Sequence, residues 1–259
     1  MPSDPYQNAL TILNAQGNLR VWSLLATVFG DLAQGQGDQI EGPVLSALMS
    51  KMQIKPEATR VALHRLRNDD WIASDKAGRT SLHRLTDTGR RESAAASHRI
   101  YAPPATAARD WQIVLLETSA AESRDRMNKL GFAPLTSRIY VGLNTAQPPA
   151  GALSMPGTEP PAWFGEQLEP KALAQEYAAL HDRLQAVQAL ELDPRRLTPI
   201  QIGAMRCLIV HGWRRLVLRH PDLPSHLYSS KWKGDACRAL VAALLAQLPR
   251  PTREALHDC

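Results

Sequence analysis

The sequence has little cysteine, no long apolar run and no secretion signal, and each absence excludes a class of protein. Its three cysteines, Cys207, Cys237 and Cys259, are an odd and widely spaced set, which argues against a disulfide-stapled secreted fold. The longest apolar runs, such as CLIVHGW, are too short to span a bilayer. The N-terminal residues MPSDPYQN lack the basic and apolar regions of a signal peptide. We therefore expect a reduced, cytoplasmic protein without a membrane segment.

The common signatures of catalysis are also missing. The sequence has no Walker loop, dinucleotide fingerprint, HExxH motif or GxSxG elbow. Cys207 and His211 have the spacing of two metal ligands on one helix face, but no CxxC pair accompanies them, so we expect a core cysteine and a structural histidine. Glu117 and Glu122 form a possible carboxylate pair, which helix caps and solvated side chains explain equally well. We expect no enzyme, no metal and no cofactor.

What is present is a globular composition with a local basic excess. The 259 residues are 44% hydrophobic and 21% charged, which fits a folded chain of two domains or three small ones. The formal net charge is +5, and residues 50–99 alone carry eleven basic and six acidic side chains. A basic excess confined to one window indicates a local contact with a polyanion.

The order of elements around that window is typical of a winged helix-turn-helix. Apolar spacing predicts helices at 20–33 and 43–52, and a third helix that begins at Pro56 and is bounded by Asn68, Asp69 and Asp70. In this third helix Ala58, Ala62 and Leu66 form a buried stripe with Leu63. Residues 71–85 then predict a β-hairpin whose turn, 76–79, is basic.

A winged helix would place the third helix in the major groove of DNA and the hairpin on the flanking backbone. The candidate DNA-binding residues are Lys55, Thr59, Arg60, His64, Arg67, Lys76, Arg79 and Arg84. Arg65 is set apart because it has the spacing to pair with Asp69. Two other interpretations stay open: the arginines are ordinary solvated residues, or the winged helix contacts another protein.

The rest of the chain divides into a mixed segment and a helical one. Strand, helix and strand patterns at 110–117, 119–131 and 137–143 indicate half of a ferredoxin-like domain, followed by a Pro-rich loop at 147–161 and one further strand at 163–169. Helical periods then fill 171–190, 197–220 and 232–248. The stretch 195–221 holds six arginines and no carboxylate. The candidate residues for binding an anionic effector are Arg206, Trp213, Arg214, Arg215 and Trp232, although a solvated helical face with a buried tryptophan explains the pattern as well.

Several segments together resemble the phenylacetic acid degradation repressor (PaaX-like) family of transcriptional regulators. They are LRVWSLLATVFGD, RVALHRLRNDDWI, GRTSLHRLT and RCLIVHGWRRLVLRHPDLPSHLYSSKWKGDACRAL. The resemblance implies an α+β, mostly helical protein in three domains: a winged-helix DNA-binding domain with an N-terminal helix at 1–104, a ferredoxin-like middle domain, partly irregular, at 105–168, and a helical domain at 169–259.

The resemblance also implies a function. It predicts a homodimeric repressor of aromatic catabolism genes that binds a double-stranded operator and is released by phenylacetyl-coenzyme A or a related acyl-coenzyme A. The middle domain is also similar to small CRISPR-associated ferredoxin-like nucleases, whose metal-binding aspartate ends the first strand. Glu117 stands there in this sequence, so a metal-dependent nuclease is the less favoured alternative.

Overall fold

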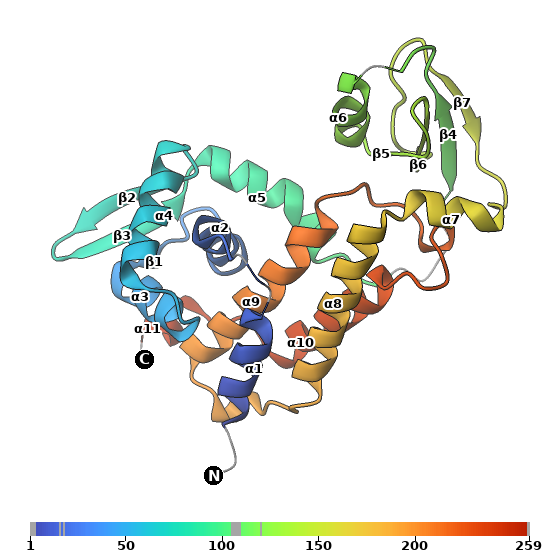
Figure 1. Ribbon diagram of the computed structural model, residues 1–259. Coiled ribbons are helices and arrows are strands. Elements are labelled where there is room, and N and C mark those ends of the chain that lie inside the picture. Colours follow the sequence, from blue (N-terminus) through green and yellow to red (C-terminus); the bar gives the residue numbers. More distant parts are fainter. Residues whose placement is uncertain (1–3, 16, 18, 105–109, 120, 258–259) are drawn as a thin grey trace. The chain divides into compact units, whose positions relative to one another are not determined.

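The computed structural model describes residues 4–15, 17, 19–104, 110–119 and 121–257, and the side chains of residues 121 and 122 lie outside that description. The chain is of the mixed α+β class, with helices in the majority (Figure 1). It divides into two compact units, each assembled from separate stretches of sequence. The first unit comprises 1–102, 182–214 and 240–259, and the second comprises 103–181 and 215–239. The division at residues 104 and 168 stays a prediction.

The N-terminal stretch of the first unit has five helices and a small antiparallel sheet. Its elements are α1 (Pro5–Asn14), α2 (Val21–Leu32), β1 (Ile40–Glu41), α3 (Gly42–Lys51), α4 (Pro56–Asn68), β2 (Ile72–Ala77), β3 (Thr80–Leu85) and α5 (Asp87–Ile100). The strands lie in the order β1-β3-β2. The helix and hairpin positions follow the predicted pattern, whereas β1 lies in the Gly-rich stretch 35–42, between the two predicted helices, where the pattern predicts no strand.

Local chemistry accounts for the boundaries of α4 and the hairpin. Pro56 starts the helix because its fixed φ suits the first turn, and Glu57 places a carboxylate beside the free amides there. The helix ends at Asn68, and two residues further on Asp70 takes a positive φ of 52°, which turns the chain toward the hairpin. The hairpin turns through two residues because Ala77 pairs with Thr80, and Gly78 supplies the positive φ of 61° that this turn requires.

The C-terminal stretch is helical, as predicted. Its elements are α8 (Lys171–Gln188), η1 (Pro194–Arg196), α9 (Pro199–Val217), η2 (Ser225–Leu227), α10 (Gly234–Gln247) and α11 (Arg253–His257). No helix of the described residues has the length and apolar character needed to cross a bilayer.

Within the first unit, α9 packs closely against α2 and α3. A methyl group placed on Gly203 would lie 3.0 Å from a methyl carbon of Leu48 and 3.6 Å from one of Leu32, so a larger residue would require the Leu48 side chain to shift. Contacts further along α9 fall on earlier residues of α2, from Asp31 back to Ser23. The core of this unit is therefore built by both ends of the chain.

The second unit contains a four-stranded antiparallel sheet. Its strands lie in the order β5-β6-β4-β7, with α6 on the face that buries Phe132 and Tyr140. The elements are β4 (Trp111–Leu115), α6 (Ala121–Lys129), β5 (Phe132–Pro134), β6 (Ile139–Leu143), β7 (Leu153–Pro156) and α7 (Ala162–Leu168). The predicted strands at 110–117 and 137–143 and the helix between them are present.

The predicted strand at 163–169 is wrong, because this segment is the helix α7. Pro161 precedes the helix. Phe164 and Leu168 are four residues apart, so they lie on one helical face, and they pack there in an apolar cluster with Trp111. The fourth strand is β7, inside the Pro-rich stretch that predicted only a loop. It lies at the sheet edge, where Pro156 is tolerated because only one side of the strand needs to pair.

Candidate nucleic-acid interface

The exposed face of α4 presents basic side chains to solvent. Arg60 is 73% exposed and bonds along the helix to Glu57 at 3.0 Å. His64 is exposed and lies 3.4 Å from the amide nitrogen of Asn68. Arg67 is exposed too and donates to the Ser74 hydroxyl on β2 at 3.5 Å. These contacts hold the side chains weakly, so each group can still turn toward a ligand.

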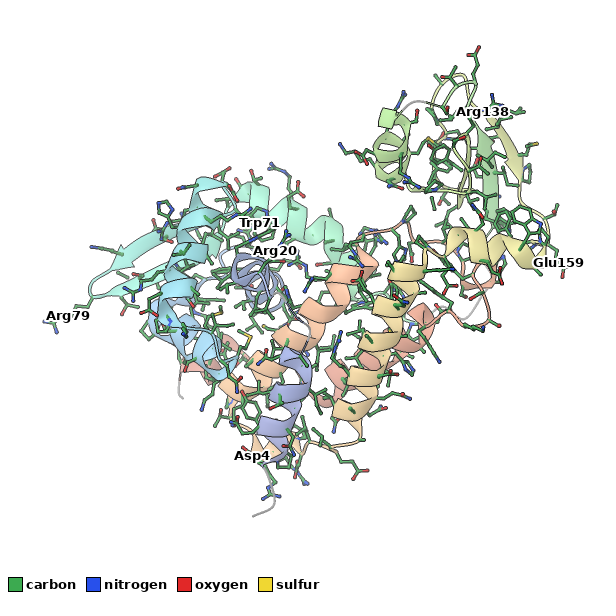
Figure 2. All side chains as sticks on the ribbon, viewed as in Figure 1. Asp4, Arg20, Trp71, Arg79, Arg138 and Glu159 are labelled. Carbon is green, nitrogen blue, oxygen red and sulfur yellow. The ribbon has the colours of Figure 1, made fainter. Side chains whose placement is uncertain are left out.

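The hairpin and the start of α4 supply further basic groups. Lys55, at the N-cap of α4, and Lys76 and Arg79, near the hairpin turn, are exposed. Figure 2 shows Arg79 at the outer end of the hairpin, pointing away from the rest of the unit. Arg84 is paired with Asp75 of the neighbouring strand, which neutralises part of its charge.

A groove of about 600 Å³ lies between α3, α4 and the hairpin. Its lining includes Arg60, Arg67 and Arg79, so it joins the basic residues of the helix to those of the hairpin. His83 also lines the groove and bonds the Ser74 hydroxyl at 2.8 Å. Burial, together with the nearby Arg67 charge, lowers the pKa of His83 below 6.5 and favours its neutral form.

Thr59 does not share the exposed face of α4. Its side chain is buried at 7% exposure and its hydroxyl bonds the Lys55 carbonyl at 3.3 Å. Thr59 precedes Arg60 by one position, which rotates it by about a quarter of a turn toward the core. Thr59 also lines the groove, and its contact with DNA stays a prediction.

Arg65 has two intramolecular contacts. Its guanidinium carbon lies 4.4 Å from the ring centre of Trp22 on α2, and its Nε lies 3.5 Å from the Asp69 carboxylate. The first is a cation–π contact and the second is the i,i+4 pair that the spacing indicates. Arg65 therefore connects α4 to α2.

Two of the five effector candidates, Arg206 and Trp213, are buried in the first unit, and a third, Arg214, is half-buried there. Arg206 is 6% exposed and forms two bonds of 3.0 Å with the Asp31 carboxylate. Its third nitrogen donates to the carbonyls of Leu245 and Leu248. Asp31 also accepts from the Tyr101 hydroxyl at 2.7 Å, and burial together with this carboxylate raises the pKa of Tyr101.

Trp213 and Arg214 likewise have partners inside the unit. Trp213 is 1% exposed and its indole nitrogen donates to the Ile100 carbonyl at 2.9 Å. Arg214 donates to the Ser23 carbonyl and to the Thr27 hydroxyl on α2, and burial lowers its pKa. These contacts give both residues a role in packing α9 against the N-terminal helices.

The other two candidates lie in the second unit. Arg215 is exposed. Trp232 is half-buried and stacks on Tyr228 with ring centres 4.3 Å apart and planes 12° apart. Tyr177 and His220 complete this aromatic cluster, joined by a 2.6 Å bond between the tyrosine hydroxyl and the imidazole. Such a cluster offers flat apolar faces beside polar atoms.

The metal-ligand spacing of Cys207 and His211 has another explanation. Cys207 is fully buried, and burial raises the pKa of its thiol, which favours the uncharged form. His211 faces the Thr27 hydroxyl on α2 at 3.2 Å. Among the described residues no three His, Cys, Asp or Glu side chains cluster as metal ligands would. Glu117 is exposed, and the Glu122 side chain lies outside the description.

Asp31, a buried carboxylate that contacts Arg206, Tyr101 and Arg250, was not among the residues selected from the sequence. A usable signal was present, because Asp31 is the only charged residue in the mostly apolar helix VWSLLATVFGDL. A charge within an apolar helix indicates a buried partner.

An exposed basic helix next to a basic hairpin, held on a helical core, defines a class of α+β proteins suited to contact a polyanion. Comparison with known proteins identifies the family. The model for the PaaX-like protein matches residues 20–89, and the model for the PaaX-like protein C-terminal domain matches residues 168–258. The chain belongs to the PaaX-like family of transcriptional regulators.

The chain is also similar to one curated protein in sequence and to one solved structure in fold. The chain is 25% identical over 244 residues to the transcriptional repressor PaaX of Escherichia coli strain K12, covering 84% of this chain and 77% of the relative. Among solved structures it is similar in fold to the uncharacterized protein Rv0674 from Mycobacterium tuberculosis, with a TM-score of 0.51 and 19% identity. That match covers 83% of this chain and 91% of the other.

Proposed function

We propose that the protein is a transcriptional repressor that binds double-stranded operator DNA through a winged helix-turn-helix formed by α3, α4 and the β2–β3 hairpin. The observation that carries the proposal is the basic groove between helix and hairpin. Arg60 and Arg67 on α4 and Arg79 at the hairpin tip line this one groove, although they come from different elements. Arginine forks suit both guanine edges and phosphates.

The two elements would contribute differently to binding. An α-helix fits the major groove, so Arg60, His64 and Arg67 would meet base edges and phosphates. Arg79 would reach the flanking phosphates, which carry no sequence information. Four antiparallel strands in the order β5-β6-β4-β7 agree with a ferredoxin-like middle domain, and the name of the Escherichia coli relative agrees with a repressor.

The regulatory part of the proposal concerns dimerisation and an effector. We infer a homodimer on a pseudo-palindromic operator, controlling aromatic catabolism genes and released by a small acidic effector. An effector that prefers the form unsuited to DNA lowers operator affinity by the ratio of its two affinities. Because Arg206, Trp213 and Arg214 already bond inside the protein, Arg215 and Trp232 are the side chains best placed to meet a ligand from solvent.

A gel-shift series with the DNA upstream of the protein's own gene tests the proposal. We expect the double variant Arg60→Ala/Arg67→Ala to lose at least tenfold in affinity, since each good base contact is worth about 1–3 kcal/mol. Arg79→Ala should weaken all sequences alike and flatten the salt dependence by about one unit of slope. Arg196→Ala is the matched control, because Arg196 is an exposed arginine of η1 outside all these elements.

The same series repeated with phenylacetyl-coenzyme A and other acyl-coenzyme A thioesters tests the effector. The expected result is loss of the shifted band with one thioester and not with coenzyme A alone. Unchanged operator affinity in a folded Arg60→Ala/Arg67→Ala variant would contradict the assignment of α4 as the recognition helix.

A further inference from the structure

The exposed face of α4 carries one apolar side chain among polar ones. Val61 is 71% exposed, more than any other large hydrophobic side chain of the described residues. The others that are exposed, Leu130, Leu153, Met155 and Trp163, all lie in the second unit. At helical spacing Val61 lies between Glu57 on one side and His64 and Arg65 on the other.

The neighbouring long side chains leave Val61 uncovered because each has a partner elsewhere, on α4 itself or on α2. Arg60 turns back to Glu57, His64 faces Asn68, and Arg65 lies over Trp22. The packed face of α4 is formed instead by Ala62 and Leu66, which are 4% and 2% exposed. Valine is also a poorer helix former than alanine, lysine or glutamine, so the helix itself gains nothing from it at this position. Neither packing nor helix stability explains Val61.

An apolar group on a helix that enters the major groove has one chemical counterpart there. Among the base edges only thymine presents a methyl group, and apolar side chains contact it. Val61 lies in the first half of α4, next to Arg60 and one turn before His64. We propose that Val61 is a specificity-determining residue that contacts a thymine methyl in the operator, an inference that rests on the proposed DNA-binding function.

Replacing thymine by deoxyuridine removes this methyl and leaves every hydrogen-bonding group of the base pair in place. The experiment uses the full-length protein and the operator fragment, with each thymine exchanged in turn for deoxyuridine. At one position of each half-site we expect the exchange to weaken wild-type binding about fourfold, the effect of losing one buried methyl-sized contact. Val61→Ala removes the contact from both half-sites of the dimer, so it should bind the unmodified operator about sixteenfold more weakly and show no further loss at either position.

Two variants serve as controls. Val61→Thr keeps one of the two methyl groups and the shape, so it should retain sensitivity to the same deoxyuridine. Leu153→Ala removes an exposed apolar side chain of the second unit and should leave the deoxyuridine pattern unchanged. Thermal unfolding of Val61→Ala should match or exceed that of the wild type, because alanine favours the helix.

The outcomes separate this inference from the proposed function. If the operator binds through Arg60 and Arg67 but no deoxyuridine effect disappears in Val61→Ala, the contact assigned to Val61 is wrong and the DNA-binding function stands. If the wild type binds no operator fragment, both are wrong.

Discussion

The buried ion pair between Asp31 on α2 and Arg206 on α9 makes a strong prediction about stability. We expect Asp31→Asn to destabilise the protein markedly, because it leaves the Arg206 guanidinium in the interior without its countercharge. The two side chains are 0% and 6% exposed, so water does not replace the lost partner. Breaking a buried pair by removing one partner costs about 3–5 kcal/mol.

The surroundings place this variant near the lower end of that range. The asparagine oxygen still accepts one hydrogen bond from Arg206. The carbonyls of Leu245 and Leu248 also continue to accept hydrogen bonds from the Arg206 guanidinium. We therefore expect a loss of about 3 kcal/mol, which lowers the melting temperature by about 6–12 °C in a protein of this size. Urea unfolding followed by circular dichroism measures the free energy, and a thermal melt measures the shift.

A second variant tests whether the loss comes from the pair itself. Arg206→Met removes the charge and keeps an apolar chain of similar length, and Asp31 retains Tyr101 and Arg250 nearby. The double variant should cost less than the sum of the two single variants by about 1–3 kcal/mol, because no uncompensated charge remains. A loss below about 1 kcal/mol for Asp31→Asn would refute this account. So would an Arg206→Met variant that keeps full stability and loses only the effector response.

Two further predictions concern the elements around the groove. Gly89→Ala in α5 should destabilise the protein by about 1–3 kcal/mol in urea unfolding, since the added methyl would overlap the Trp71 carbonyl oxygen and force the backbone to move. The pKa of His83 in the folded protein lies below its unfolded value of 6.5, so the unfolded chain binds a proton at a higher pH than the folded chain does. The free energy of unfolding should therefore fall as the pH drops between these two values. Thermal melts from pH 5 to 8 should show this slope in the wild type and lose it in His83→Gln.

The sequence predicts α4 and the hairpin well because their signals are local. A proline at the first turn, an alanine stripe and a Gly-containing turn each determine the conformation of neighbouring residues. The same stripe did not identify Thr59 as buried. Threonine is a polar residue, but Thr59 lies on the core side of α4, and its hydroxyl is satisfied there by a bond to the Lys55 carbonyl.

The second unit shows where local signals fail. Leu153–Pro156 has neither the length nor the alternation of a strand, and it becomes one because the edge of β4 is available for pairing. The WFGEQL segment has bulky residues that favour strands, but Phe164 and Leu168 meet Trp111 and its apolar neighbours only when they lie on one helical face. Tertiary contacts decide the conformation in both cases, because a short segment has only a weak local preference for helix or strand.

Pairs between distant residues were beyond the sequence pattern altogether. Asp31 and Arg206 are 175 positions apart, and Trp213 bonds a carbonyl 113 positions away. The run of six arginines without a carboxylate at 195–221 suggested an anionic ligand. For Arg206 the anion is a carboxylate of the protein itself, so a one-sided charge run does not reveal whether its counterion is internal.

The position of α2 bears on how a repressor of this kind can respond to a ligand. Within the first unit α2 bonds α9 through Asp31, and it contacts α4 where Arg65 lies over the Trp22 ring. The proposed recognition helix α4 and the helix with the buried arginine, α9, therefore share one neighbour. A ligand that favours one placement of α9 can act on α4 through packed side chains without touching the operator. A coupling of about 1–3 kcal/mol, typical of allosteric proteins, would change operator affinity by about 5- to 150-fold. Asp31→Asn weakens this route on the α9 side, where the contacts of His211 and Arg214 with α2 remain. If the proposed effector acts through it, a folded variant should bind the operator and release it less completely than the wild type when that effector is added.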